Sequence, residues 1–211
     1  MKVILVNGSP HQNGSTSRAL QEVEKTLVEE GIEIENFWIG NKPISGCIGC
    51  YSCAKIGKCS IDDTVNEFIE KAKSADGFIF GTSVHYAGMT GAMTSFMDRV
   101  FYSAGCSGNN KIFRYKPAAS VIVARRAGTT ATYDQINKYF GITQMPIISS
   151  RYWNMVHGKD ASDLEADEEG MQTMRILARN MAYFLKCIDA GKEKGIELPK
   201  TEKTILTNFV R

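Results

Sequence analysis

The chain has 211 residues, of which 43% are hydrophobic and 23% are charged. These fractions are those of an ordinary folded domain, and they exclude the collagen-like, disordered and disulfide-scaffold classes. One domain of about 150–200 residues fits this length. The 25 Lys and Arg residues against 23 Asp and Glu residues leave a net charge of +2, which is too close to neutral for a basic nucleic-acid clamp.

No apolar run in the sequence is long enough to cross a membrane. The longest run that looks buried, residues 118–124, falls far short of the roughly 20 apolar residues that a membrane helix needs. The N-terminal apolar run is interrupted almost at once by Asn7-Gly8-Ser9-Pro10, which argues against a signal peptide. We therefore expect a cytoplasmic protein with neither a membrane nor a nucleic acid as its partner.

The apolar period changes repeatedly along the chain between that of a buried strand and that of an amphipathic helix. Asp62 is expected to cap the helix that follows the second strand. Strands are predicted at residues 3–6, 32–38, 77–81, 119–124 and 146–148. Helices are predicted from residue 15 to about residue 30, from 62 to 72, and around 93–101, 133–140 and 174–188.

Five strands that alternate with helices predict a doubly wound α/β fold, in which a parallel sheet carries helices on both faces through right-handed crossovers. We assign residues 1–190 to this domain and residues 191–211 to a C-terminal tail. Ligands of such sheets bind beyond the carboxyl ends of the strands, at the topological switch point. The loops after the first, third and fourth strands are therefore the expected binding site.

The loop after the first strand, residues 8–17, has the parts of a phosphate cradle. Its small residues allow close approach, its hydroxyls donate hydrogen bonds, and the following helix contributes free N–H groups and a positive dipole end. The loop matches neither the P-loop pattern nor the dinucleotide glycine pattern, so a mononucleotide phosphate fits it better. A plain helix cap in a glycine-rich turn is the alternative.

The loops after the third and fourth strands carry a second set of candidate residues. Residues 81–91 offer an aromatic and aliphatic wall with nearby backbone N–H groups, which suits a flat aromatic cofactor. Within this loop, His85 is more readily a stacking or hydrogen-bonding residue than a general base. Arg125, Arg126 and Gly128 reach the same end of the sheet, where they either contact a cofactor or cosubstrate or stay solvated.

Three motifs together resemble the NADPH-dependent FMN reductase family of flavodoxin-like proteins: Gly8-Ser9-Pro10 with Gly14-Ser15-Thr16, residues 83–91, and Phe96-Met97-Asp98-Arg99. Their order and spacing agree with this family over about residues 1–190. The resemblance implies a flavodoxin-like, five-stranded parallel sheet in the order 2-1-3-4-5, with FMN as the cofactor. It implies that the FMN phosphate is held by Ser9, His11, Gly14, Ser15 and Thr16. It also implies that the isoalloxazine ring is lined by Ser83, Val84, His85, Tyr86, Ala87, Gly88 and Met89, and that Arg125, Arg126 and Gly128 close over it.

The same resemblance implies an oxidoreductase whose electron chemistry belongs to the flavin. The expected donor is NAD(P)H or a ferredoxin, and the expected acceptor is a small flat molecule such as a quinone, a flavin, an azo compound or a nitroaromatic. A flavin-bearing electron carrier without a substrate of its own is the alternative. Two positions depart from the family pattern, because the family often has Arg where this chain has His11 and Pro where it has Ser83.

Four of the six cysteines, Cys47, Cys50, Cys53 and Cys59, fall within one loop. In a chain without a signal peptide, such clustering indicates metal or redox chemistry rather than disulfides. Four thiolates are what a [4Fe–4S] cluster requires, and the spacing resembles the compact cysteine motif of iron–sulfur flavoproteins, a branch of the same family. The alternatives are reduced thiols without a cluster and a structural zinc ion. We expect the cluster to exchange electrons with FMN, because the loop leaves the second strand at the carboxyl end of the sheet.

Tyr152 and Trp153 follow the last predicted strand in a loop. Two large aromatic side chains are costly to leave in water, so they cover either the flavin, in this subunit or a neighbouring one, or the core of the monomer. Together with the wide cysteine loop and the tail at residues 191–211, they predict a homodimer or homotetramer in which residues of one chain lie near the flavin of another.

Overall fold

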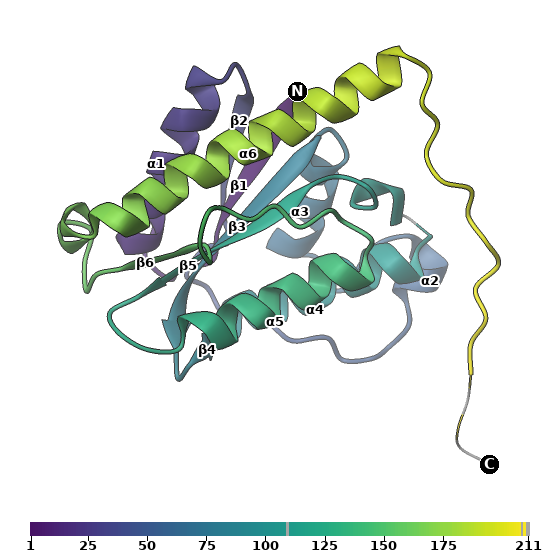
Figure 1. Ribbon diagram of the computed structural model, residues 1–211. Coiled ribbons are helices and arrows are strands. Elements are labelled where there is room, and N and C mark those ends of the chain that lie inside the picture. Colours follow the sequence, from purple (N-terminus) through teal and green to yellow (C-terminus); the bar gives the residue numbers. More distant parts are fainter. Residues whose placement is uncertain (109, 208, 210–211) are drawn as a thin grey trace.

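A computed structural model describes residues 1–108, 110–207 and 209, which fold as a twisted parallel sheet between two layers of helices (Figure 1). The strands lie in the order β2-β1-β3-β5-β6, and β4 pairs with the end of β3 in the antiparallel sense. Their bounds are β1 Lys2–Asn7, β2 Glu33–Trp38, β3 Gly77–His85, β4 Gly88–Met89, β5 Ala118–Ala124 and β6 Met155–His157.

The central strand β1 shows why this sequence forms a sheet covered on both sides. Ile4 and Val6 point into one apolar core, with helices α3 (Thr64–Ala72), α4 (Gly91–Cys106) and α5 (Thr129–Ile142). Val3 and Leu5 point into the other core, with helices α1 (Ser15–Glu29) and α6 (Glu168–Glu193). Both faces are therefore dry, which explains the continuous apolar run. The remaining short helices are α2 (Cys53–Ile56), η1 (Asn110–Ile112) and η2 (Asp163–Ala166).

A group of phenylalanine rings fixes α3 and α4 against the sheet. The ring of Phe68, in α3, is completely buried, and its centroid lies 5.2 Å from those of both Phe37 and Phe96. Aromatic pairs at such separations contribute about 0.5–1.5 kcal/mol beyond the area that they bury. The two helices that flank the cysteine loop are thus held firmly at their base.

The carboxyl ends of the strands meet at one edge of the sheet. Asn7, the last residue of β1, lies beside Trp38 in β2 and beside Gly81 in β3. Because these strands end at the same height, the loop after β1 lies next to the loop after β3, as the sequence predicted from the rule for parallel sheets.

The prediction of five strands in the order 2-1-3-4-5 is wrong in detail, because the sheet has six strands. The segment at residues 146–148 forms only an isolated bridge between Ile147 and Ala118, and β6 at residues 155–157 lies beside β5 instead. Pro146 has no backbone N–H to donate, which limits pairing there. The strand β4 was missed because it is two residues long and exists only as the return of a tight hairpin.

The cap of α3 is Asp63 and not Asp62. The Asp63 carboxylate accepts a hydrogen bond from the backbone N–H of Val65 at 3.1 Å, whereas Asp62 accepts one from the Asn66 side chain. From sequence alone, either of the two adjacent aspartates could cap the helix. Asp63 takes this position because its carboxylate is also held by Arg99, at 2.6 Å.

The chain ends in an extended tail. Beyond α6, the described residues form neither helix nor strand, and Arg114 contacts them through a 2.9 Å hydrogen bond to Thr201. Several apolar side chains of the tail are exposed, among them Ile205, Leu206 and Phe209. Across the described part of the chain, no helix combines the length and the apolar character that a membrane span requires.

Candidate functional site

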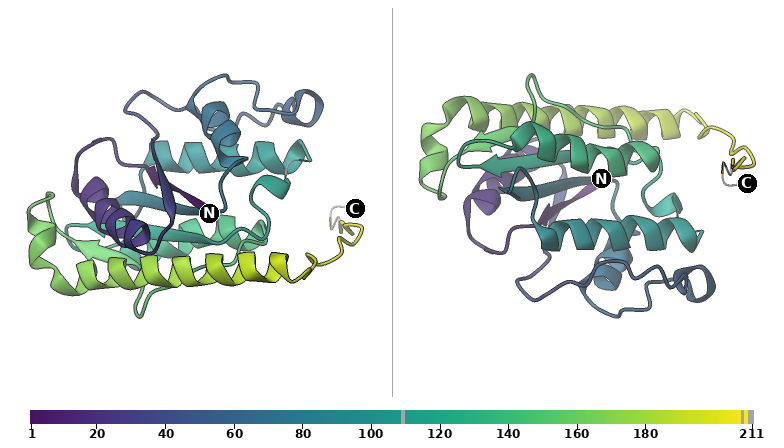
Figure 2. Two further views of the ribbon diagram at one scale, coloured as in Figure 1. Left: turned by 90° about the horizontal axis from the view of Figure 1, so that it is seen from above. Right: turned by 90° about the horizontal axis from the view of Figure 1, so that it is seen from below.

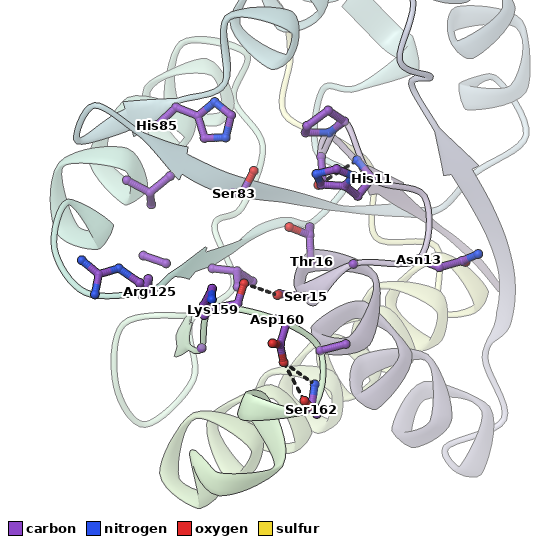
Figure 3. A pocket seen from close by; sticks show the side chains of 18 residues that line it. His11, Asn13, Ser15, Thr16, Ser83, His85, Arg125, Lys159, Asp160 and Ser162 are labelled. Carbon is purple, nitrogen blue, oxygen red and sulfur yellow. Dashed lines mark hydrogen bonds between the residues drawn. The ribbon is translucent and has the colours of Figure 1, made fainter.

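A cavity of about 730 Å³ lies at the carboxyl ends of β1, β3 and β5 (Figure 3). Four segments line it. They are residues 9–11 and 13–16 from the loop after β1 into the start of α1, residues 83–85 at the end of β3, residues 123–125 at the end of β5, and residues 158–162 after β6. A cavity of this size suits a nucleotide-sized ligand.

The first loop is held in shape by its own polar groups. The side chain of Asn7 accepts a hydrogen bond from the N–H of Ser9 at 3.0 Å and donates one to the carbonyl of Gln12 at 3.2 Å. The Trp38 indole N–H donates to the Ser9 carbonyl at 2.9 Å. Gly8 is required at its position, because a Cβ there would lie 2.4 Å from the sulfur of Met93. The loop therefore has its curved form before any ligand arrives.

Two hydroxyl groups at this cavity are buried without a partner. Within the described part of the chain, neither Thr16 Oγ1 nor Ser83 Oγ has a hydrogen-bond partner, although both atoms are shielded from solvent. The N-terminus of α1 is also uncapped, since Gly14 has no side chain to accept from the first N–H groups of the helix. Buried donors of this kind are normally satisfied, so their convergence marks a place for an anion. The phosphate of FMN fits these donors.

The charges around the cavity are mixed. His11, Arg125 and Lys159 lie at the cavity and are exposed, and Asp160 lies beside Lys159 on the same loop (Figure 3). The Asp160 carboxylate is engaged within its own loop by the side chain and N–H of Ser162, at 2.6 and 3.1 Å. These hydrogen bonds, led by that of the Ser162 hydroxyl, hold the pKa of Asp160 below its usual value. Its charge is thus engaged within its own loop, by Ser162 and by the neighbouring Lys159.

Most of the residues predicted for this site are brought together. The cavity lining includes Ser9, His11, Gly14, Ser15, Thr16, Ser83, Val84, His85 and Arg125. The other predicted residues, Tyr86, Ala87, Gly88, Met89, Arg126 and Gly128, lie outside the lining. Sequence reasoning missed the segment 158–162, which Ser15 contacts through a 3.5 Å hydrogen bond from its hydroxyl to the carbonyl of Lys159. The carboxyl-end rule would have found this segment if the last strand had been placed at residues 155–157.

The hairpin between β3 and β4 continues from the cavity-lining residues at the end of β3. Tyr86 and Ala87 at its tip both have positive φ angles, and the Tyr86 side chain is 106% exposed. Gly128, with φ +95°, packs against this tip so closely that a Cβ would lie 2.6 Å from Cα of Ala87. Met89, by contrast, is buried. Gly128 thus joins the hairpin to the loop after β5, and only glycine fits there.

The cysteine loop runs outward from β2 and along α4 (Figure 2). All six cysteines of the chain are free thiols. Four of them line one hollow of about 20 Å³, which is room for about one water molecule. Cys47 and Cys50 are exposed, Cys59 is partly exposed and Cys53 is buried. Within the described part of the chain, no group of three or more His, Cys, Asp or Glu side chains is arranged to hold a metal ion.

The thiols of this loop differ in their surroundings. Hydrogen bonds from the side chains of Ser52 and Ser60 lower the pKa of Cys50 to about 7. Burial, followed by the neighbouring thiol of Cys106, raises the pKa of Cys53. Since the thiolate is the form that binds metals, the exposed end of the loop is the more reactive one.

Below the hollow lies Arg99, whose side chain is only 1% exposed. Its guanidinium forms an ion pair with Asp63 at 2.6 Å and donates hydrogen bonds to the sulfur of Cys59. Burial alone lowers the pKa of Arg99, and the hydrogen bonds from it to Asp63 and Cys59 outweigh this and raise it. The sequence singled out Arg99 only as part of a family motif, and its place beneath the cysteines was not predicted.

The cysteine hollow and the cavity lie at different points along α4. The helix begins beside the first loop, where the Thr90 hydroxyl donates to the carbonyl of Gly8 at 3.1 Å. The hollow is formed farther on, by Arg99, Tyr102 and Ser103. At 1.5 Å of rise per residue, these positions lie about 12–18 Å from the start of the helix. The loop leaves β2 at the edge of the sheet that the sequence predicted, and its thiols then lie farther along α4.

A family model of NADPH-dependent FMN reductases matches residues 1–160 of the chain. The chain belongs to this family. Its membership makes it an FMN-type flavoprotein oxidoreductase.

This member of the FMN reductase family is similar to two known proteins over nearly its whole length. An iron–sulfur flavoprotein from Methanocaldococcus jannaschii is 34% identical over 194 residues, which cover 89% of this chain and 99% of the relative. An iron–sulfur flavoprotein from Archaeoglobus fulgidus is 30% identical over 215 residues, which cover 99% of this chain and 92% of the relative. A solved flavodoxin from the domain Archaea, 14% identical, matches 88% of this chain and 99% of its own with a TM-score of 0.57, which shows a flavodoxin-like fold.

Proposed function

We propose that this protein binds FMN in the 730 Å³ cavity and reduces a small flat acceptor, such as a quinone, flavin, azo compound or nitroaromatic, with electrons from NAD(P)H or a ferredoxin. The observation that carries the proposal is the convergence of two unpaired buried hydroxyls and an uncapped helix N-terminus on one cavity. Such a set of donors suits a phosphate and has no partner within the described chain.

In this proposal, different residues bind the phosphate and the ring of FMN. The FMN phosphate is held by Ser9, His11, Gly14, Ser15 and Thr16. The ring is held along Ser83, Val84 and His85, with Tyr86, Ala87, Gly88, Met89, Arg125, Arg126 and Gly128 forming the mouth. When bound, FMN supplies the one- and two-electron chemistry, so the protein needs no catalytic triad and only binds, orients and shields.

We further propose that Cys47, Cys50, Cys53 and Cys59 ligate one [4Fe–4S] cluster. The four thiols surround one hollow, and the relatives that match nearly the whole chain are named iron–sulfur flavoproteins. A single zinc ion needs its ligands to converge on one point, whereas each thiolate of a four-iron cluster binds a different iron. Within the described residues the four thiols line one hollow but are not grouped to hold a single ion, which favours a cluster over zinc in this proposal. Unligated reduced thiols are the outcome that would contradict it.

The alternative function is that of an electron carrier without its own substrate. The position of the thiols favours it, since Cys47 and Cys50 are exposed on a loop that projects away from the cavity. A protein partner can approach such a loop directly. Turnover of a small acceptor by the purified protein distinguishes the two functions.

We propose a homodimer or homotetramer, with residues 1–190 as the FMN-binding domain and residues 191–211 as a tail. Tyr152 and Trp153 support this assembly, because they are 50% and 49% exposed and their rings pack against each other, with centroids 4.6 Å apart. In the proposed assembly a neighbouring subunit covers them, near its own flavin. Light scattering that shows only a 23.3 kDa species at micromolar concentration would contradict the assembly.

The decisive experiment is purification without oxygen, followed by assays of flavin, iron and acid-labile sulfide. The expected protein is yellow to brown, releases FMN on denaturation and is reduced by NADH, NADPH or reduced ferredoxin. Colourless protein that cannot be reconstituted with FMN would contradict the flavin proposal. The variant Cys50→Ser is expected to lose about four irons per chain while it keeps FMN, because the two sites use different loops.

A further inference from the structure

The most completely buried charge of the cysteine region belongs to Arg99. Among all the fully buried side chains of the described residues, it is the largest by volume. The mechanism of flavin binding does not use it, since it lies about 12 Å along α4 from the cavity end of the helix. A buried guanidinium is costly to desolvate, so its partners indicate what it is there for.

The two edges of the guanidinium face two different groups. One edge holds the Asp63 carboxylate in a bidentate pair, from Nη1 at 2.6 Å and from Nη2 at 2.9 Å. The other edge, Nε and Nη2, donates to the sulfur of Cys59 at 3.4 and 3.3 Å. Backbone carbonyls of Ile61 and Ser45 take further donor contacts, at 2.8 and 3.3 Å. Arg99 therefore connects the start of α3 to the last cysteine of the loop.

Cys59 is also fixed through its backbone. The Asn66 side chain accepts a hydrogen bond from the Cys59 N–H at 3.1 Å and donates one to the Cys59 carbonyl at 2.9 Å. Asn66 lies in α3, and thus on the same rigid support as Asp63. Cys59 is thus held through both its sulfur and its backbone, whereas Cys47 and Cys50 are exposed.

We infer that Arg99, oriented by Asp63, is a positioning residue for the iron–sulfur cluster: it presents the Cys59 thiolate to the cluster and raises the cluster's reduction potential through N–H···S hydrogen bonds. This inference rests on the proposed [4Fe–4S] site. An ion pair that served only the fold would need Asp63 alone, yet Nε donates to the Cys59 sulfur and Nη2 is shared between that sulfur, Asp63 and the Ile61 carbonyl. Arginine suits this task because its fork can engage two acceptors at once in fixed geometry.

The direction of the effect follows from charge. Reduction adds one negative charge to the cluster and its thiolates, and hydrogen bonds to the sulfurs stabilise that added charge. Removal of Arg99 therefore makes the cluster harder to reduce. Removal of the Asp63 charge acts in the opposite sense, because the buried guanidinium is then left without its counter-charge. Two variants of one ion pair are thus expected to move the potential in opposite directions.

The test is a redox titration of anaerobically prepared protein, with the cluster followed by visible absorption and electron paramagnetic resonance. The variants are Arg99→Met, Asp63→Asn and, as the matched control, Lys58→Gln, which removes an exposed cation next to Cys59. Asn keeps the ability to cap α3, so Asp63→Asn changes the charge with little change to the helix. FMN content and circular dichroism report whether each variant is folded.

In Arg99→Met, the ratio of reduced to oxidised cluster at a fixed potential is expected to fall at least tenfold, which is a drop of about 59 mV for a one-electron couple. Asp63→Asn is expected to raise this ratio, and Lys58→Gln to change it less than twofold. Iron loss from an Arg99→Met protein that is folded and keeps FMN also supports the positioning role. If Arg99→Met is unstable, the inference is tested by the ratio of reduced to oxidised cluster in Asp63→Asn, which is expected to exceed that in the Lys58→Gln control.

Two results would overturn the inference. One is an Arg99→Met protein with wild-type iron content and a ratio that matches that of Lys58→Gln, and the other is an Asp63→Asn protein whose ratio stays level or falls. A wild-type protein that contains FMN but no iron or acid-labile sulfide is a different failure, because it removes the proposed cluster itself. The iron content of the wild type therefore separates the failure of the proposed function from the failure of this inference.

Discussion

The cavity at the end of β1 and the hollow among the cysteines differ in how far their residues are already held in place for a ligand. In the cavity, the loop 8–17 is held by Asn7 and Trp38, and the donors already converge. Among the cysteines, Cys53 and Cys59 are held against α4, while Cys47 and Cys50 project from an exposed loop. A site of the first kind loses little entropy when its ligand binds, whereas one of the second kind is completed by the ligand.

The strongest way to break the first site is to remove one of its unpaired donors. In Thr16→Val a methyl group replaces the buried hydroxyl, and the Kd of FMN is expected to rise about tenfold to hundredfold, because a hydrogen bond to a charged group contributes about 1.5–3 kcal/mol. Without FMN, the variant is expected to unfold at the same temperature as the wild type or a higher one, since an unsatisfied buried hydroxyl is gone. Fluorescence titration and thermal unfolding measure the two effects.

The matched control for this variant is Thr26→Val on the same helix. Thr26 is also buried, but its hydroxyl already donates to the carbonyl of Glu22 at 3.0 Å. Its substitution is expected to leave FMN binding unchanged and to lower stability slightly. A Thr16→Val protein that binds FMN within twofold of the wild type would show that the cradle does not use this hydroxyl.

The exposed half of the cysteine loop is probed by its chemistry in cluster-free protein. The pKa of Cys50 is lowered to about 7 from the ordinary value of 9.0, with hydrogen bonds from Ser52 and Ser60 as the leading causes. A lowered pKa places more thiolate at neutral pH, so alkylation of Cys50 is expected to be half-maximal near pH 7. Since a weaker base is also a weaker nucleophile, the net gain in rate at neutral pH is about fivefold.

Peptide mapping by mass spectrometry assigns the alkylation to Cys50 at each pH. Substitution of Ser52 and Ser60 together by alanine is the control, and it is expected to move the midpoint back toward 9.0. An unmoved midpoint in that variant would mean that the two hydroxyls do not hold the thiolate.

The smallest expected effect comes from adding a cation to the cavity. His11 is exposed at the cavity, and in His11→Arg a guanidinium can pair with the FMN phosphate. Exposed ion pairs contribute about 0.2–1 kcal/mol, so the Kd is expected to fall no more than about fivefold, and less in high salt. Gln12→Arg adds the same charge one residue away, on the side that faces Trp38. If both variants lower the Kd of FMN equally, the effect comes from net charge and not from a contact between residue 11 and the phosphate.

Local chemistry made the cavity predictable from sequence. The residues that build the first loop are contiguous, and the rule for parallel sheets placed the loops after β3 and β5 beside it. The orientation of the hairpin tip was not predictable, because the outward direction of Tyr86 depends on the positive φ angles at its turn and on the packing of Gly128.

The misplaced last strand has a similar cause. Residues 146–148 and 155–157 are both short apolar segments, and a local pattern cannot choose between them. The choice depends on Asn154, which accepts from the N–H of Ser150 at 3.0 Å and donates to the carbonyl of Ile148 at 3.3 Å. These contacts fold the intervening loop so that β6 arrives beside β5.

The spacing of the cysteines singled out the four that line one hollow. It did not predict that Arg99 lies beneath them. A charged residue in a helix is usually solvated, and the burial of Arg99 arises from contacts with residues 36 and 40 positions away. Such a contact becomes visible only when α3 and α4 are packed side by side.

The pairing of Arg99 with Asp63 also bears on how the proposed cluster would be inserted. In small metal-dependent domains, the metal supplies the charge balance that lets the interior close, so such chains fold only with metal. Here the guanidinium has its counter-charge on the same polypeptide, at 2.6 Å, above a core of packed aromatic rings. Folding would then not depend on the proposed cluster, and iron and sulfide would enter afterwards, through the open side where Cys47 and Cys50 are exposed.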